Sequence, residues 1–303
     1  MKVTVIGGAN RDILGSSEKS FTLRDSNIGK VGISFGGVGH NIAYNCRLLG
    51  LQTDLITAVG NDHDGRQILE HLDKIDVGHE NVLVSGDTPT DKYLAITDEK
   101  GDMIAAINDM QCVRQITPKY LMSLSGLSAS LIAVDANLNA DTLSMVSGIK
   151  NRLTFFEPVS AAKADKAKDF IGGFDIIKPN LMEAEVLSGI KINKEEDIVK
   201  AGKYFVRQGV RATFITAGSN GVYAFFGTSV YHKKAPKLEV VNSTGAGDAF
   251  SAGVIYSILN GYKLTDTVAF AMKCSELALS CDQAVNEGLS AELVNIFLEG
   301  TKK

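Results

Sequence analysis

A glycine-rich segment followed by an aspartate holds the residues best suited to chemistry in this chain. Residues 242–250 read Asn-Ser-Thr-Gly-Ala-Gly-Asp-Ala-Phe and open an apolar stretch that predicts a buried helix. Gly245, Ala246 and Gly247 leave backbone N–H groups uncovered at the positive end of that helix, where a phosphate or a developing oxyanion is stabilised. Asp248 lies in the first turn and could accept a proton from an alcohol. The segment therefore indicates phosphoryl transfer to a hydroxyl group.

The same residues also have a purely structural interpretation. Glycine-rich turns into helices are common, and Asp248 in the first turn would then only interact favourably with the helix dipole. This segment alone leaves the two interpretations equally open. Its late position in the chain and the other motifs favour the chemical one.

Two clusters near the start of the chain could bind a polyol. Asn10 and Asp12 follow the first predicted strand, and open α/β sheets bind ligands beyond the carboxyl ends of their strands. An amide and a carboxylate together could hold vicinal hydroxyls. Gly37 would let a bound ring approach the backbone, and Asn41 could hydrogen-bond a polyol, although a hinge into a helix explains this second cluster equally well. No dinucleotide fingerprint is present, because G-x-G-x-x-G is absent.

Two motifs in the second half of the chain could bind a nucleotide. Asn180 and Glu183 lie three residues apart at a predicted helix start, which suits water-mediated holding of Mg²⁺ beside phosphates. The same pair is almost a capping box, which needs no metal, and both interpretations can hold together. Thr216, Gly218 and Gly221 close a strand and begin a hairpin against which adenine or its phosphates could lie. A P-loop is excluded, since G-x-x-x-x-G-K-[ST] does not occur.

The composition argues against several classes of protein. With 303 residues, of which 45% are hydrophobic, the chain can bury a core as one large α/β domain or two smaller ones. A net charge of −4 without a Lys/Arg cluster argues against nucleic-acid binding. The four cysteines and five histidines show neither C-x-x-C nor zinc spacing. No apolar run reaches membrane length and the chain starts directly with a strand, so we expect a cytoplasmic protein without a membrane partner.

Short apolar strands alternate with amphipathic helices along the chain. This alternation predicts a mainly parallel sheet covered on both faces, within one main domain. The expected strands are Val3–Ile6, Leu131–Val134, Leu153–Phe156, Asp175–Ile177 and Ala212–Thr216. The expected helices lie at about Gly39–Leu49, Gly65–Lys74, Pro118–Leu124, Asp141–Ile149, Lys194–Gln208 and Thr265–Ser280, in addition to the one that begins near Asp248.

Two stretches, at about 13–35 and 88–113, alternate polar and apolar residues instead of showing helical spacing. The simplest interpretation is a small β flap built from two separated insertions, and ordinary surface hairpins are the alternative. A flap would exclude water during phosphoryl transfer, and water competes with the acceptor alcohol.

In this order the motifs resemble those of the ribokinase family of carbohydrate kinases, also called the phosphofructokinase-B type. The resemblance covers essentially the entire chain. It implies one kinase domain over residues 1–303, built as an αβα sandwich with a β lid, that uses ATP and Mg²⁺ to phosphorylate an alcohol. The resemblance assigns Asp248 as the base, Gly245, Ala246 and Gly247 as the anion hole, and Glu183 as the Mg²⁺ residue; it places Asn180, Thr216, Gly218, Gly221 and Thr244 on the nucleotide, and Asn10, Asp12, Gly37 and Asn41 on the sugar.

Finer features resemble a branch of the family that phosphorylates the C-nucleoside pseudouridine at its ribose 5′-hydroxyl. They include Asn108 within Asn-Asp-Met, Asn137 within Asp-Ala-Asn-Leu, and Lys163 shortly after Pro-Val-Ser. The resemblance implies that these three residues contact the nucleoside. A kinase for ribose, a fructose-type sugar, adenosine or another nucleoside is the alternative, and a non-catalytic nucleoside sensor is the alternative from a different class.

Some positions depart from the family pattern. Asn242 stands where many relatives carry an aspartate tied to a monovalent-cation site, so a K⁺ requirement is left open. Val38 replaces the lysine of ribokinases, which argues against free ribose, and the roles of His40 and Glu157 are open. Exposed lid strands commonly need covering, so we expect a homodimer paired through its lids.

Overall fold

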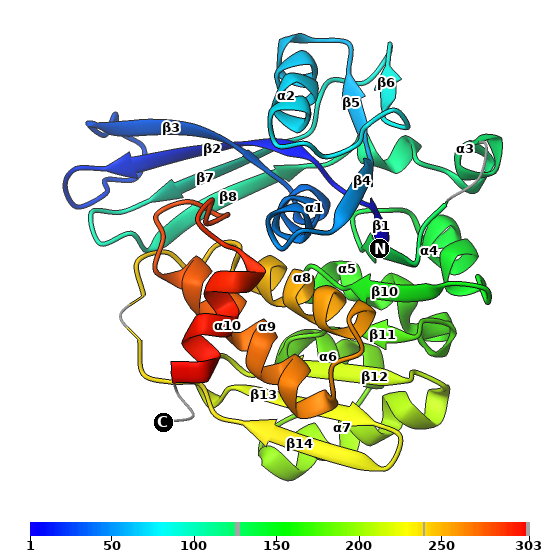
Figure 1. The fold of residues 1–303 in the computed structure, drawn as a ribbon. Helices are drawn as coiled ribbons and strands as arrows, with labels where there is room; N and C mark the ends of the chain where they lie inside the picture. The colour runs from blue at the N-terminus through cyan, green and yellow to red at the C-terminus, as the bar shows by residue number, and fades with distance from the viewer. Residues whose placement is uncertain (125–127, 239, 301–303) are drawn as a thin grey trace.

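An eight-stranded sheet runs through the middle of the molecule (Figure 1). The computed structural model describes residues 1–124, 128–238 and 240–300. The strand order is β14-β13-β12-β11-β10-β9-β1-β4, with parallel pairing from β12 to β4 and antiparallel pairing of β13 and β14. The bounds are β1 Lys2–Ile6, β4 Gln52–Ile56, β9 Leu131–Asp135, β10 Leu153–Glu157, β11 Ile176–Ile177, β12 Ala212–Thr216, β13 Val222–Phe226 and β14 Ser229–Lys233.

Helices cover both faces of this sheet, and each face has its own apolar core. A strand buried on both faces reads as a continuous apolar run, as Leu131–Val134 does, and all five residues of β9 are buried. One face is covered by α1 Val38–Leu48, α2 His63–Lys74, α8 Ala246–Leu259, α9 Leu264–Leu279 and α10 Ala291–Gly300. The other is covered by α3 Pro118–Ser123, α4 Ala140–Ser147, α5 Ala161–Ala164, α6 Leu181–Ser188 and α7 Glu195–Gln208. The predicted three-layer αβα sandwich is confirmed.

A separate four-stranded sheet, the small sheet, extends beside the central one (Figure 1). Its order is β3-β2-β7-β8, and its strands are β2 Asn10–Ser17, β3 Gly29–Gly36, β7 Lys92–Thr97 and β8 Met103–Asp109. These strands come from the two stretches whose alternation indicated extra β structure. A third sheet pairs only β5 Ala58–Gly60 with β6 Leu83–Ser85, and three 3₁₀ helices span Val113–Gln115, Asp165–Gly173 and Gly218–Asn220.

The register of the small sheet sorts its side chains onto two faces. Asp12 lies opposite Ser34 and Tyr93, and Tyr93 lies opposite Asn108. Directly opposed residues point to the same face of a sheet, so these four side chains form one row. The opposite face presents the large apolar side chains Val31, Ile33, Leu94 and Ile107, all of them exposed.

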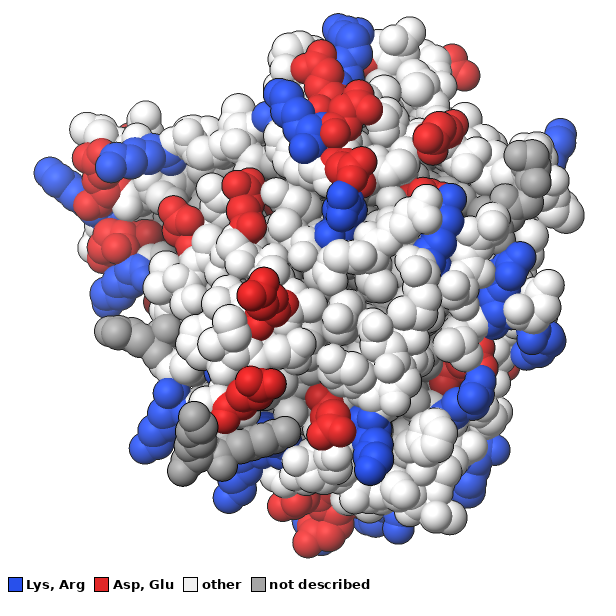
Figure 2. All heavy atoms as spheres, in the orientation of Figure 1, with Lys and Arg blue, Asp and Glu red and all other residues white. Residues whose placement is uncertain are grey.

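Charges of both signs are interspersed over the face of the molecule shown in Figure 2, without a broad region of one sign. Among the described residues, no helix is both long enough and apolar enough to span a bilayer.

Candidate active site

The glycine segment forms the start of α8, as the sequence predicts. Gly245 has φ +80°, and a Cβ there would lie 1.8 Å from the carbonyl oxygen of Ala284, so this position requires glycine. A Cβ at Gly247 would lie 3.2 Å from Lys178 Nζ, which brings an ammonium group beside the start of the helix. Backbone N–H groups of the first turn and this cation together form an anion-binding environment.

Asp248 lies in the first turn of α8, and its side chain is mostly buried. Asn41 Nδ2 donates to Asp248 Oδ2 at 2.8 Å, although the two residues are 207 positions apart in the sequence. The contact forms because α1, which begins after the glycine pair at 36–37, packs on α8. The structure thus joins the predicted base to a residue predicted to hold the sugar.

Burial raises the pKa of the Asp248 carboxyl to about 7, and the negative charge of Glu157 adds to the increase. The hydrogen bond from Asn41 and the Lys178 ammonium act in the opposite direction. A carboxyl group with a pKa near 7 can accept a proton from an alcohol and release it again near neutral pH. This balance suits a general base.

A buried ion pair lies beside Asp248. Lys178 Nζ is 2.9 Å from Glu157 Oε2, and Ser251 Oγ donates to the same oxygen at 2.7 Å. Burial alone would lower the pKa of Lys178, yet its pKa is raised, because Glu157, Glu183 and Asp248 attract the ammonium. The ammonium is therefore charged at neutral pH and lies among three carboxyl groups.

Sequence reasoning gave no role to Lys178 and left that of Glu157 open. A signal was nevertheless present, because Glu157 ends a buried strand and Lys178 follows the neighbouring one. Charged residues at the carboxyl ends of adjacent parallel strands meet at one edge of the sheet, where ligands bind.

Asn180 and Glu183 form a complete capping box at the start of α6. Asn180 Oδ1 accepts from the Glu183 N–H at 2.9 Å, while Glu183 accepts from the Asn180 backbone N–H and from its Nδ2, both at 2.8 Å. The structural interpretation of this pair is therefore correct. Burial raises the pKa of Glu183 to about 7, and the charge of Glu157 contributes to the increase.

The charges around Glu183 also fit a divalent cation. Glu157, Glu183 and Asp248 are three buried carboxyl groups with Lys178 as the cation among them. Mg²⁺ binds through one or two carboxylates and several waters, so it needs no cage of protein ligands. Within the described ranges, no three or more His, Cys, Asp or Glu residues are arranged as a metal cluster. Both carboxylate oxygens of Glu183 accept hydrogen bonds from Asn180, which leaves them lone pairs for contact with water.

The predicted nucleotide residues meet at the same sheet edge. Thr216 forms a parallel bridge with Asn180, and its N–H donates to the Pro179 carbonyl at 3.0 Å. Gly218 and Gly221 both have positive φ in the turn that follows β12. The structure therefore places the turn at 216–221 directly against the capping-box motif.

The loop before α8 holds Thr244 and Asn242. The Thr244 N–H donates to Asn242 Oδ1 at 2.9 Å, and Asn242 Nδ2 donates to the Asp282 carbonyl at 2.9 Å. The amide of Asn242 is thus engaged within the protein and carries no charge. An uncharged amide that is hydrogen-bonded at both ends is a poorer ligand for a monovalent cation than a carboxylate at this position would be.

Asn10 and Asp12 lie where the small sheet joins the central one. Asn10 Nδ2 donates to Asp12 Oδ1 at 2.5 Å, so the two side chains are in direct contact. Gly36 and Gly37 pass close to them, since a Cβ at Gly36 would lie 2.1 Å from Asp12 Oδ2 and one at Gly37 would lie 2.4 Å from the Gly8 carbonyl oxygen. Burial raises the pKa of Asp12, against its hydrogen bond with Asn10.

The carboxyl group of Asp135 connects the loops that follow β1 and β9 through hydrogen bonds. It is fully buried at the end of β9 and accepts from the backbone N–H groups of Gly8 and Asn137, both at 2.8 Å. Lys163 Nζ donates to Asn137 Oδ1 at 2.5 Å, so these two predicted substrate residues are in contact. Sequence reasoning quoted Asp135 within a motif but gave it no role.

Asn108 lies apart from these contacts. It is exposed on β8, in the row that contains Tyr93 and Asp12. Because Asp12 is in the same row, Asn108 lies on the face of the small sheet that carries the sugar residues. The structure gives Asn108 no direct contact with Asn137 or Lys163.

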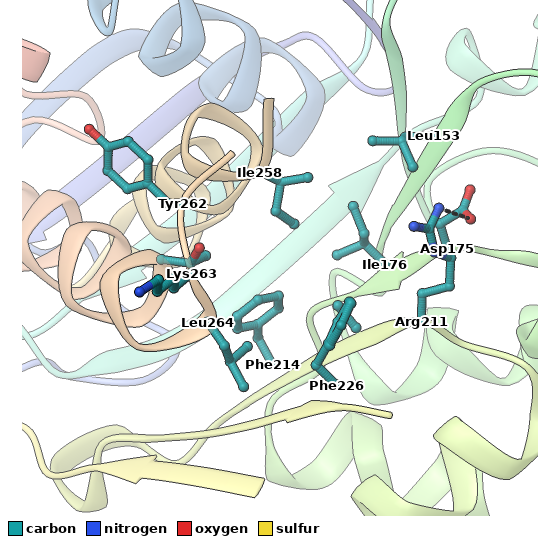
Figure 3. A pocket seen from close by; sticks show the side chains of 12 residues that line it. Leu153, Asp175, Ile176, Arg211, Phe214, Phe226, Ile258, Tyr262, Lys263 and Leu264 are labelled. Atoms are coloured by element: carbon teal, nitrogen blue, oxygen red, sulfur yellow. Dashed lines mark hydrogen bonds and ion pairs between the residues drawn. The ribbon is translucent and has the colours of Figure 1, made fainter. Parts of the chain in front are cut away.

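Two hollows lie away from Asp248. One, of about 250 Å³, is lined by apolar side chains that include Phe214, Phe226 and Ile258, with the Asp175–Arg211 ion pair at 3.5 Å (Figure 3). Part of its lining, Leu153, Asp175, Ile176, Arg211 and Ala212, lies at the amino ends of β10, β11 and β12, so the hollow is at the end of the sheet opposite to Glu157 and Lys178. The other, of about 430 Å³, is bordered by Ser219 and Asn220 of the turn after β12.

Comparisons with known proteins agree with this geometry. Residues 1–291 match the pfkB family carbohydrate kinases. The chain is 36% identical to the pseudouridine kinase of Escherichia coli (strain K12) over 304 residues, which cover 99% of this chain and 97% of that protein. A solved carbohydrate kinase from Agrobacterium tumefaciens is 27% identical with a TM-score of 0.85, covering 98% of this chain and 97% of that one. Arabidopsis thaliana ribokinase, solved with ribose and ATP, shares the fold with a TM-score of 0.85 at 21% identity, over 98% of each chain.

The chain therefore belongs to the pfkB family of carbohydrate kinases. It is a phosphotransferase with an alcohol group as acceptor, and its substrate is a small sugar or nucleoside.

Proposed function

We propose that the protein transfers the γ-phosphoryl group of ATP to the ribose 5′-hydroxyl of pseudouridine and so forms pseudouridine 5′-phosphate. The observation that carries the phosphoryl-transfer chemistry is the buried Asp248 at a glycine helix start, hydrogen-bonded to Asn41. The substrate is supported by 36% identity to a pseudouridine kinase over nearly the full length of both chains.

Asp248 acts as the general base in this proposal. Its carboxylate takes the proton of the 5′-hydroxyl as the oxygen–phosphorus bond forms and the bond between the γ-phosphorus and the bridging oxygen breaks, which releases ADP. The N–H groups of Gly245, Ala246 and Gly247 stabilise the charge of the transferring group. Lys178, close to Gly247, adds a fixed positive charge that needs no reorganisation during the reaction.

Mg²⁺ neutralises phosphate charge when it is bound, and Glu183 is the residue that would hold it through water. Asn180, Thr216, Gly218, Gly221 and Thr244 line the nucleotide side. This placement is supported by the backbone contact between two segments. Thr216, at the end of β12, forms a bridge with Asn180 and donates its N–H to the Pro179 carbonyl, so the two segments lie side by side.

The nucleoside lies between Asp248 and the small sheet in this proposal. Asn10, Asp12, Gly37 and Asn41 hold the ribose, while Asn108, Asn137 and Lys163 contact the base. Pseudouridine presents two ring N–H donors and two carbonyl acceptors, and uridine lacks one of those donors. The amide groups of Asn108 and Asn137 can pair with both kinds of atom, whereas the Lys163 ammonium can only donate to a carbonyl acceptor. We also propose that the small sheet acts as a lid within a single kinase domain.

Comparing acceptors tests the substrate directly. ADP formation is measured with pseudouridine, uridine, adenosine, ribose and fructose at equal concentrations. We expect kcat/KM for pseudouridine to exceed that for uridine by at least about 10-fold, since a buried partner left without its donor costs about 1–3 kcal/mol. A higher kcat/KM for ribose or for adenosine would overturn the proposed substrate and leave the family assignment intact.

A homodimer paired through the lids belongs to the same proposal. Its support is the outer face of the small sheet, where Val31, Ile33, Leu94 and Ile107 are exposed side by side. A contiguous apolar surface of this kind commonly marks an interface.

A further inference from the structure

A chain of hydrogen bonds leads from His40 to Asp248. His40 Nδ1 lies 3.0 Å from Asn41 Oδ1, and Asn41 Nδ2 donates to Asp248 Oδ2 at 2.8 Å. The three residues are 2%, 5% and 8% exposed. Asn41 is therefore held at both ends of its amide group, and one of its two partners is the proposed base.

The protonation of His40 follows from its surroundings. Burial lowers the pKa of His40 to about 4, and the neighbouring His71 lowers it further, against the hydrogen bond with Asn41. A neutral imidazole carries one N–H, and an amide oxygen can only accept. The proton therefore lies on Nδ1. Nε2 is left as an acceptor that has no partner in the described structure, whereas the other tautomer would bury an unpaired N–H.

This tautomer fixes which way the Asn41 amide points. With Oδ1 bonded to His40, the NH₂ group faces Asp248 and favours the ionised carboxylate. If the amide were rotated by half a turn, Oδ1 would face Asp248 and would favour the protonated carboxyl. A carboxyl group must be ionised before it can accept a proton. Only the orientation with the Asn41 NH₂ group facing Asp248 therefore supports a role of Asp248 as the base.

We infer that His40 is a positioning residue that keeps Asp248 ionised by fixing the orientation of the Asn41 amide. The inference deepens the proposed function, because it rests on Asp248 being the base. Other groups also act on this site. Glu157 from β10 and Asp135 from β9 oppose ionisation of Asp248, and Lys178 after β11 favours it.

The groups that face His40 come from two helices. His71 on α2 has its ring centre 5.2 Å from that of His40, and Tyr44 on α1 lies at 6.2 Å. Glu287 interacts with both His71 and Tyr44. All of these groups are retained in the two variants described next, and both variants remove the imidazole ring and its contacts with His71 and Tyr44. The two variants therefore differ from each other in the hydrogen bond to Asn41.

Two variants of similar shape separate the hydrogen bond from packing. Asn and Leu both branch at Cγ, but only Asn at position 40 can still donate to the Asn41 oxygen. Carboxyl ¹³C NMR of the protein alone follows the pKa of Asp248, and Asp248→Asn assigns its resonance. We expect His40→Leu to raise that pKa by about one unit and His40→Asn to leave it within about 0.3 units. An unchanged pKa in His40→Leu, or equal shifts in both variants, would overturn the inference.

The pH profile gives a second readout that a merely structural role would not move. In His40→Leu the acid limb of kcat/KM should shift to higher pH by the same amount, and activity should recover toward the wild-type value at alkaline pH. A loss of activity that is equal at every pH would contradict the inference.

A third measurement needs no variant and covers the case in which His40→Leu does not fold. Nitrogen-15 NMR of the wild-type imidazole should show the proton on Nδ1, and a proton on Nε2 would overturn the inference. Because both NMR measurements use the protein without substrate, failure to phosphorylate pseudouridine would overturn the proposed function and not this one.

Discussion

Burial of Asp248, the proposed base, raises the pKa of its carboxyl group at a cost to the stability of the folded protein. Its pKa rises from 3.8 to about 7 because the carboxylate is buried near Glu157. The folded protein then binds more protons than the unfolded chain between these two pH values, so this residue makes stability fall as pH rises from about 4 to about 7.

Asp248→Asn should therefore stabilise the protein while it abolishes the base. The gain should be small near pH 4, grow as pH rises, and level off above about 7 at roughly 2–4 kcal/mol. Chemical denaturation at several pH values measures it, with the exposed Asp169→Asn as a control for the loss of one charge. A gain that did not depend on pH would contradict a raised pKa for Asp248.

Two elements bring the reacting groups together. Helix α8 supplies the glycine start and Asp248, while α1 supplies Asn41, and the two helices pack against each other. The small sheet adds a row of polar side chains that begins at Asp12. Each element carries only part of the site, so in the proposed function the position of the small sheet decides whether the nucleoside is enclosed.

Asn108→Ala tests the small sheet as a lid. We expect KM for the nucleoside to rise by about 5- to 30-fold, which corresponds to a lost hydrogen bond of about 1–2 kcal/mol, and KM for ATP to change by less than about twofold. Lys30→Ala, exposed on another strand of the same sheet, should alter neither KM value. An unchanged nucleoside KM in Asn108→Ala would count against lid contact.

At the scale of the whole molecule, the small sheet projects from the central sheet (Figure 1), and Val31, Ile33, Leu94 and Ile107 on its outer face are exposed among the residues that the structure describes. Ile33 on this face is 59% exposed, and Ile296 on α10, outside the small sheet, is 58% exposed. The two isoleucines thus offer a matched pair of sites for introducing a charge.

Light scattering or sedimentation should show a wild-type dimer, a monomer for Ile33→Glu and a dimer for Ile296→Glu. A buried, unpaired carboxylate at an interface costs several kcal/mol, which is enough to dissociate a dimer at micromolar concentration. A wild-type monomer, or a dimer of Ile33→Glu, would rule out pairing through the lids.

Local sequence was sufficient to predict most of the parallel strands and most of the helix starts. Leu131–Val134 is a continuous apolar run, and the capping residues Asn180 and Glu183 are three positions apart. Strand β4 was not predicted, because Gln52, Thr53 and Asp54 break its apolar pattern; Asp54 instead pairs with Lys2 at 2.5 Å on the neighbouring strand.

The long-range contacts of the site could not be predicted in the same way. The Asn41–Asp248 hydrogen bond depends on how α1 packs on α8, and the Glu157–Lys178 ion pair depends on the order of β10 and β11. Neither residue spacing nor residue type encodes that packing. The link from His40 to Asn41 became visible only with the side chains in place.

The central claim is that Asp248 accepts the proton of the acceptor hydroxyl. Rapid-quench measurement of a single turnover by Asp248→Asn, with saturating ATP and pseudouridine, tests it most directly. We expect a rate of chemistry lower by about 10²- to 10⁴-fold, with an ATP Kd within about threefold of wild type. A single-turnover rate within about threefold of wild type would show that Asp248 is not the base.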